Sequence, residues 1–164
     1  MGKIYVREQL KEVLHGHRGQ GRRIAFTNGC FDILHVGHVR YLREARALGD
    51  LLVVAVNSDA SVRALKGAQR PLVPEAERVE MVAALEMVDY VTVFSELTPL
   101  ALIEELRPDV LVKGGDWSAE EIVGRQSVES WGGRVAVVSL TEGLSTTNII
   151  ARVLAVYGSG SATS

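Results

Sequence analysis

Residues Thr27–His38 read TNGCFDILHVGH, and this stretch decides how the chain folds. It follows the apolar run Arg23–Phe26 and leads into a segment with helical spacing, so it predicts a turn between a strand and a helix. Backbone N–H groups and the helix dipole favour an anion at such a helix start. Each of His35 and His38 can donate an N–H to a phosphate oxygen, and protonation would add positive charge. Gly37 lets an anion approach the backbone closely, so the stretch predicts a phosphate site.

Apolar runs and helix-like segments alternate along the rest of the chain. The runs lack polar alternation, as buried parallel strands do, and they are Arg23–Thr27, Leu51–Asn57, Tyr90–Phe94, Val110–Lys113 and Arg134–Ser139. The helix-like segments are Ile4–Leu14, which we expect to break at Gly16–Gly21, and then Val39–Leu48, Ala60–Leu65, Pro74–Met87, Pro99–Leu106 and Ser145–Tyr157. The alternation predicts an α/β fold, a Rossmann-like open parallel sheet of about five strands with helices on both faces. Ligands bind such sheets beyond the carboxyl ends of the strands, near the switch point of the winding.

The composition is that of an ordinary globular protein. We expect the 164 residues to form a single domain over residues 1–157 and a small, polar, disordered tail over 158–164. The net charge of −2 and the pI of about 6.1 imply no broad basic face, so we expect neither nucleic acid nor a membrane as partner. No apolar run approaches the roughly 20 residues that span a bilayer, and the N-terminus lacks the apolar centre of a signal peptide. We therefore expect a cytoplasmic protein.

Cys30 is the chain's one cysteine, which excludes an intrachain disulfide. We interpret it as a packing residue, because phosphoryl transfer to a phosphate nucleophile needs no enzyme thiol. No clustered Cys/His spacing is present, so we predict no metal site made by the protein alone.

Two further segments carry groups suited to phosphate and sugar. Residues 140–150 read LTEGLSTTNII, and the hydroxyl-rich helix start at Ser145–Thr147 offers donors to a second phosphate group. Residues Val112–Trp117 read VKGGDW at the end of a predicted strand. There Lys113 can neutralise phosphate, Gly114 lets the backbone approach a ligand, and Asp116 can accept hydrogen bonds from sugar hydroxyls.

The HVGH sequence at His35–His38, preceded by Gly-x-Phe-Asp at Gly29–Asp32, resembles the cytidylyltransferase-like superfamily, whose hallmark HxGH follows the first strand. Ser145–Thr147 resembles the second signature of that superfamily, a Ser-Thr-Thr run on the triphosphate side. Within it, the VKGGDW segment and the Lys-Gly…Arg-Pro loop at Leu65–Pro74 resemble the heptose-phosphate adenylyltransferases of lipopolysaccharide assembly.

This resemblance implies transfer of AMP from ATP to D-glycero-β-D-manno-heptose 1-phosphate, which gives ADP-heptose and pyrophosphate. It also implies Mg²⁺ brought with the triphosphate and a homo-oligomer, a dimer or larger. The implied catalytic residues are His35, His38 and Lys66. The implied nucleotide-binding residues are Thr27, Asn28, Gly29, Phe31, Gly37, Lys113, Ser145, Thr146 and Thr147. The implied residues for the sugar phosphate are Asp32, Asp59, Arg70, Arg78, Gly114 and Asp116.

Three alternatives stay open. The first is a cytidylyltransferase for glycerol 3-phosphate or another polyol phosphate, but those enzymes carry an arginine where this chain has Leu140. The second is adenylyl transfer to phosphopantetheine, whose first histidine motif is spaced differently from His35–His38. The third is a nucleotide-binding module without catalysis, which would bind ATP and release no pyrophosphate.

Overall fold

The fold is built on one parallel sheet. The computed structural model describes residues 3–115, 121–139 and 143–158, and these form five strands in the order β3-β2-β1-β4-β5. The strands are β1 (Ile24–Gly29), β2 (Leu51–Asn57), β3 (Tyr90–Phe94), β4 (Val110–Gly114) and β5 (Arg134–Val138). All four neighbouring pairs are parallel, which confirms the predicted open sheet. The order reverses between β1 and β4, so the switch point lies there.

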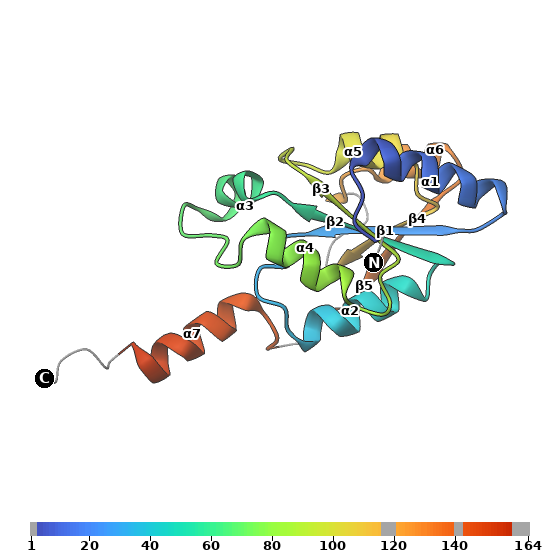
Figure 1. The fold of residues 1–164 in the computed structure, drawn as a ribbon. Helices are drawn as coiled ribbons and strands as arrows, with labels where there is room; N and C mark the ends of the chain where they lie inside the picture. The colour runs from blue at the N-terminus through green and yellow to red at the C-terminus, as the bar shows by residue number, and fades with distance from the viewer. Residues whose placement is uncertain (1–2, 116–120, 140–142, 159–164) are drawn as a thin grey trace, which may run out of the picture.

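Helices cover both faces of this sheet (Figure 1). One face carries α1 (Arg7–Gly19), α5 (Leu100–Leu106) and α6 (Arg125–Ser130), and the other carries α2 (Val36–Arg46) and α4 (Glu75–Ala83). The short α3 (Asp59–Lys66) follows the carboxyl end of β2, and α7 (Thr146–Tyr157) extends away from the body. Within the described part of the chain, no helix combines the length and the apolar character needed to span a bilayer.

The first helix differs from its predicted bounds. It begins at Arg7 because Ile4 instead forms a parallel bridge with Val91, and it continues through Gly16 to end at Gly19. The predicted glycine break is therefore wrong. A helix glycine costs about 1 kcal/mol, and tertiary contacts of the last turn, such as the 2.6 Å hydrogen bond between His17 and the Tyr90 hydroxyl, offset that cost.

Smaller differences occur elsewhere. The helix α2 begins three residues earlier than predicted, at Val36, and α4 ends at Ala83 rather than Met87. The helix α6 was not predicted at all, because its six residues bury only Val128 and so show no helical periodicity.

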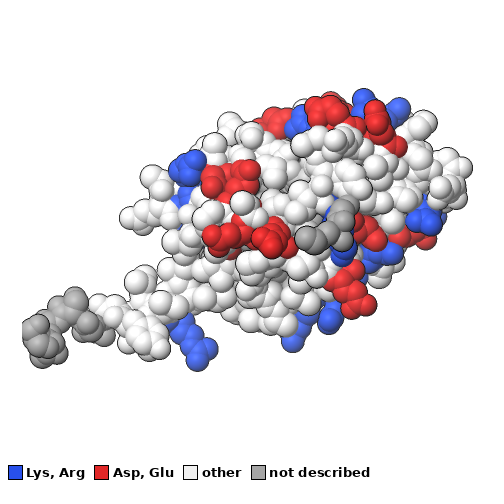
Figure 2. Space-filling model, in the orientation of Figure 1, with Lys and Arg blue, Asp and Glu red and all other residues white. Residues whose placement is uncertain are grey.

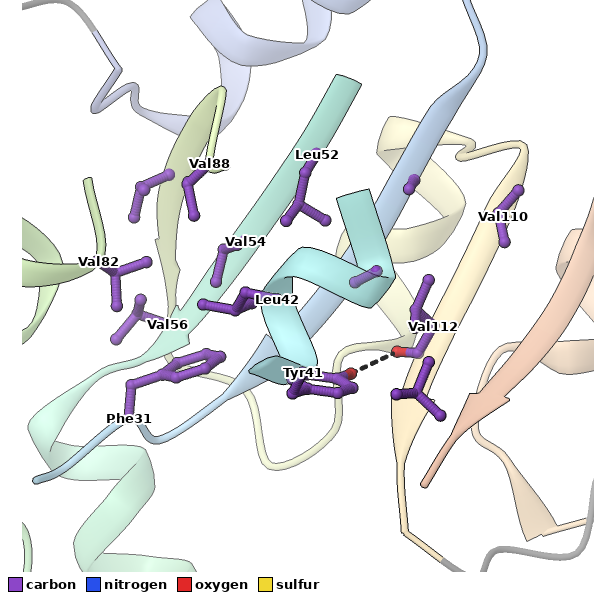
Figure 3. Packing of buried hydrophobic residues seen from close by; sticks show 14 of the residues in the cluster. Phe31, Tyr41, Leu42, Leu52, Val54, Val56, Val82, Val88, Val110 and Val112 are labelled. Carbon is purple, nitrogen blue, oxygen red and sulfur yellow. Dashed lines mark hydrogen bonds between the residues drawn. The ribbon is translucent and has the colours of Figure 1, made fainter. Parts of the chain in front are cut away.

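Side chains that alternate along the strands build a core on each face. On β2, Leu52 and Val54 pack on the side of α2 and α4, while Val53 and Ala55 pack on the side of α1 and α5. Figure 3 shows the first of these clusters, where Leu42 of α2 lies over the strands. Full burial of one such side chain contributes about 1.5–3 kcal/mol, so these layers fix the sheet that carries the strand ends.

Tyr41 connects α2 to the two strands that flank the switch point. Its hydroxyl lies 2.6 Å from Oγ1 of Thr27 on β1. It also donates to the carbonyl of Val112 on β4 at 3.2 Å, the bond drawn in Figure 3. Burial raises the pKa of Tyr41 to about 12, so the hydroxyl keeps its proton. The helix that follows the histidine motif is thereby held against both strands.

Candidate active site

Two adjoining cavities lie at the carboxyl ends of the strands, where the fold predicts a ligand, the smaller beside β1 and β4 and the larger beside β1 and β2. The smaller has a volume of about 280 Å³ and the larger about 640 Å³. The two cavities share seven lining residues, Asn28, Gly29, Cys30, Phe31, His38, Ser145 and Thr146. The first β-to-α turn and the start of α7 therefore bound one continuous site.

His35 and His38 form a stacked pair at the start of α2. Their ring centroids are 3.9 Å apart with 27° between the planes. His35 is the N-cap of α2, and its Nδ1 accepts a hydrogen bond from the Gly37 amide at 3.2 Å. An accepting Nδ1 carries no proton, so neutral His35 has its N–H at Nε2.

His38 packs against two rings. One is that of His35, and the second is the Phe31 ring at a centroid distance of 5.3 Å. Burial, with a smaller contribution from His35, lowers the pKa of His38 to about 4, and burial also lowers the pKa of His35. Both imidazoles are therefore neutral at pH 7 in the ligand-free protein, and a gain of charge by protonation in the transition state stays a prediction.

Gly37 allows the His35 ring to take this position. A Cβ at Gly37 would lie 2.9 Å from both Cε1 and Nδ1 of His35 and 3.2 Å from Cβ of Leu144. Gly37 must therefore lack a side chain so that the His35 imidazole can take its position. The sequence suggested a second reason, the close approach of an anion to the backbone.

The turn before the histidines has an unusual backbone. Phe31 has a φ of 49°, in the left-handed region that non-glycine residues rarely adopt, and this costs on the order of 1–3 kcal/mol. A Cβ at Gly29 would come within 3.0 Å of the Phe31 ring. The strained residue Phe31 supports the ring of His38, so the backbone strain lies at a residue that shapes the site.

Lys113 brings a buried positive charge to the smaller cavity. Its ammonium donates to the side-chain oxygen of Asn28, and burial lowers its pKa to about 8. An amide oxygen cannot neutralise an ammonium, so this group has the capacity to bind an anion.

Asp32 anchors the loop between α3 and α4. It is almost fully buried and accepts hydrogen bonds from the Arg70 guanidinium and from the amides of Leu72 and Val73, both at 2.8 Å. Burial alone would raise its pKa, but these amide and guanidinium contacts lower it. Asp32 lines the larger cavity with Arg70 and the exposed Lys66, but its oxygens already hold the loop.

Ser145 begins α7 as predicted. Its Oγ accepts from the Asn148 amide at 3.1 Å, which makes Ser145 the N-cap. Ser145 and Thr146 line both cavities and Thr147 lines the larger, so the hydroxyl-rich helix start lies opposite the histidine turn.

Three predicted residues lie outside the linings of these two cavities. Thr27 is fully buried, and its hydroxyl bonds to Tyr41 inside the core. Arg78 is also fully buried, and its guanidinium donates to Asp59 at 2.8 Å. None of Thr27, Asp59 and Arg78 lines the two cavities formed by the described residues, and their contact with substrate stays a prediction. Asp116, Trp117 and Leu140 lie outside those residues.

The remaining predicted residues come together. The two cavities are lined by Asn28, Gly29, Phe31, Asp32, His35, Gly37, His38, Lys66, Arg70, Lys113, Gly114, Ser145, Thr146 and Thr147. Sequence reasoning missed five other lining residues, Cys30, Tyr41, Asn57, Leu65 and Leu144. Of these, Asn57 had a usable signal, since it ends a predicted strand at the edge where ligands bind. Burial raises the pKa of Cys30, so the thiol stays protonated, as expected of a packing residue.

Comparisons with known proteins agree with this geometry. The family model described as cytidylyltransferase-like matches residues 26–152. The bifunctional protein HldE of Syntrophotalea carbinolica is 59% identical over 158 residues, which cover 96% of this chain and 32% of that protein. HldE of Geobacter sulfurreducens is 56% identical over 156 residues, with 95% and 32% covered. The chain thus spans about a third of the length of these relatives.

Two solved structures have the same fold. The lipopolysaccharide core biosynthesis protein from Thermoplasma volcanium is 29% identical with a TM-score of 0.60, and the match covers 74% of this chain and 98% of that one. The pantoate-beta-alanine ligase from Francisella tularensis, complexed with beta-gamma ATP and beta-alanine, has a TM-score of 0.61 at 14% identity, with 91% and 76% covered. The second likeness concerns the fold alone.

Proposed function

The chain belongs to the cytidylyltransferase-like family, and from this premise we propose that it is an adenylyltransferase that joins AMP from ATP to D-glycero-β-D-manno-heptose 1-phosphate. The products are pyrophosphate and ADP-heptose, and ADP-heptose is the one used for the lipopolysaccharide core. The observation that carries the transfer is the stacked pair of neutral imidazoles that shares one cavity with the start of α7. The similarity to HldE and to a lipopolysaccharide core biosynthesis protein supports the choice of sugar.

In the proposed reaction, an oxygen of the sugar phosphate attacks the α-phosphorus of ATP. One P–O bond forms there, and the bond to the β-phosphate oxygen breaks as pyrophosphate leaves with the electron pair. The sugar phosphate is already anionic at neutral pH, so no general base is needed. His35 and His38 donate N–H groups to the phosphate oxygens that gain charge, and Lys113 adds a positive charge on the same cavity.

The two anionic reactants would repel each other without cations nearby. Lys66 and Arg70 line the larger cavity and can offset that repulsion, while Ser145–Thr147 can hold the departing phosphates. Among the described residues no group of three or more His, Cys, Asp or Glu side chains could hold a metal ion. We therefore propose that Mg²⁺ arrives bound to the triphosphate, as in other phosphoryl transfers.

We further propose that the protein acts as a homo-oligomer in the cytoplasm. The helix α7 buries no side chain, and Val153, Leu154 and Tyr157 on it are more than half exposed. The segment is mostly without charge in Figure 2, as expected for a surface that contacts protein. Light scattering on the purified chain tests this proposal, and a monomer at micromolar concentration would contradict it.

Pyrophosphate release tests the proposed reaction. ATP and CTP are each paired with heptose 1-phosphate, glycerol 3-phosphate and other sugar phosphates, and the nucleotide product is identified by mass spectrometry. We expect that only the pair of ATP and heptose 1-phosphate reacts, and that its nucleotide product is ADP-heptose. Formation of CDP-glycerol would favour the polyol phosphate alternative, and ATP binding without pyrophosphate release from any pair would favour a non-catalytic module.

A further inference from the structure

Arg78 is a charged side chain in the interior of the protein. It lies on α4, its exposed fraction is 0%, and it is the largest of the fully buried side chains. Arginine is almost never fully buried unless it is paired, because an unpartnered guanidinium loses its hydration. The groups that it contacts therefore indicate why it is there.

The guanidinium holds four separate acceptors. Nε donates to the Val73 carbonyl at 2.9 Å, and Nη1 donates to the carbonyls of Cys30 and Asn57 at 2.6 and 2.8 Å. Nη2 donates to Oδ1 of Asp59 at 2.8 Å. Three of the four acceptors are backbone carbonyls, so the contact fixes the path of the chain as well as neutralising a charge.

These acceptors belong to the segments that bound the larger cavity. Cys30 lies in the turn after β1, and Asn57 ends β2; both line the cavity. Val73 closes the loop that carries Arg70, whose guanidinium bonds to Asp32 in the same turn as Cys30. The start of α3 is held through Asp59, and the last residue of this helix is Lys66.

We infer that Arg78 is a positioning residue for the reaction proposed above. From inside the protein it sets the distance between the histidine turn and the loop that carries the cavity's cations. A lysine would retain the positive charge, but its single ammonium cannot reach four acceptors that are spread around a planar fork. The inference rests on the proposed function for its catalytic consequence, and on the hydrogen bonds alone for the placement of the loop.

The test is Arg78→Lys, with Arg63→Lys as the matched control, because Arg63 is an exposed arginine on α3. The first readout is amide hydrogen exchange at Leu72 and Val73, whose N–H groups are held by Asp32. We expect exchange there to quicken in Arg78→Lys while exchange in β1 and β2 stays unchanged. The second readout is kinetic: kcat should fall by about 10- to 100-fold, as for a misplaced site, while the Kd for ATP changes less than about threefold.

Further outcomes separate the two claims. Wild-type exchange and wild-type kcat in Arg78→Lys would overturn the positioning role. A large rise in the Kd for ATP with unchanged exchange would also overturn it, since that pattern indicates direct contact with the nucleotide. If the wild type itself releases no pyrophosphate, the proposed function fails, and exchange alone decides the placement of the loop. Should Arg78→Lys not fold, Asp59→Asn removes the negative charge of one acceptor and is expected to quicken exchange at the same two amides to a smaller extent.

Discussion

The Gly37 amide lies 3.2 Å from Nδ1 of His35 and donates its hydrogen to it. This contact caps α2 and at the same time selects the tautomer of the imidazole, because the nitrogen that accepts cannot carry the proton. The other nitrogen, Nε2, then carries the N–H of the neutral ring. The spacing of the histidine motif thus determines both a helix start and a proton position.

Replacement of Gly37 by alanine should reduce activity more than stability. The new Cβ would lie 2.9 Å from two atoms of the His35 ring, so the ring must leave its stack with His38. We expect kcat to fall by about 100-fold, which is the scale for loss of one oxyanion donor. The helical position itself favours alanine, so unfolding should shift by less than about 1 kcal/mol. Steady-state kinetics and denaturant unfolding measure the two effects, and an active Gly37→Ala protein would contradict the tautomer argument.

His38→Ala should have a similar effect on catalysis. It removes the imidazole that packs against both Phe31 and His35 at the site, and we expect kcat to fall by at least about 100-fold. His15→Ala is the matched control, because His15 is an exposed histidine on α1. The two variants are compared in one pyrophosphate-release assay. Equal activity of His38→Ala and the control would remove the role of the histidine pair.

The pH dependence of kcat/KM should show that the imidazoles act in the neutral form. The pKa of His38 is lowered to about 4, so its charge state is constant between pH 6.5 and 7.5. A required imidazolium with an ordinary pKa would reduce kcat/KM about fivefold over that range, because the charged fraction falls as pH rises. We expect a flat profile there. A decline of that size across the range would show that a protonated histidine is needed in the free enzyme.

Lys113 should give the profile an alkaline limb. Its pKa is lowered to about 8 by burial, so the ammonium loses its proton, and with it the attraction for phosphate, as pH rises through 8. In Lys113→Met we expect a lower kcat/KM at pH 7 and a profile that stays flat to pH 9. A limb that persists unchanged in Lys113→Met would assign it to another group.

The sequence predicted the sheet well because its information is local. Each strand is a continuous apolar run, and the bounds of β2 and β3 are those expected. The histidine motif could be placed because a strand, a glycine turn and a helix start follow one another in the chain. Gly114 and Ser145 could be placed with it because parallel strands end at the same edge of the sheet.

What could not be predicted depends on contacts between distant segments. Arg78 follows a proline-rich loop and has the sequence context of a solvated cation, yet four acceptors from separate segments surround it. Thr27 ends an apolar run at the binding edge of the sheet, but its hydroxyl is hydrogen-bonded to the Tyr41 hydroxyl. The charge state of His38 likewise depends on how deeply its ring is buried, which spacing along the chain does not give.

The ion pair of Asp32 with Arg70 and that of Glu96 with Arg7 should differ sharply in their contribution to the free energy of unfolding. The Asp32 side chain is 1% exposed and also holds two amides, whereas the Glu96 side chain, paired with Arg7 at 2.6 Å, is 38% exposed. Asp32→Asn leaves the partly buried Arg70 without its counter-charge, so we expect a loss of about 2–4 kcal/mol in the free energy of unfolding. Glu96→Gln should cost at most about 1 kcal/mol, because solvent screens the pair. Urea unfolding at pH 7 measures both.

The contribution of Asp32 should also depend on pH. Because the lowered pKa of Asp32 stabilises the fold only while the carboxylate is charged, the gap in the free energy of unfolding between wild type and Asp32→Asn should narrow as pH falls below about 4. A gap that stays constant down to pH 2 would mean that the charge of Asp32 does not hold the loop.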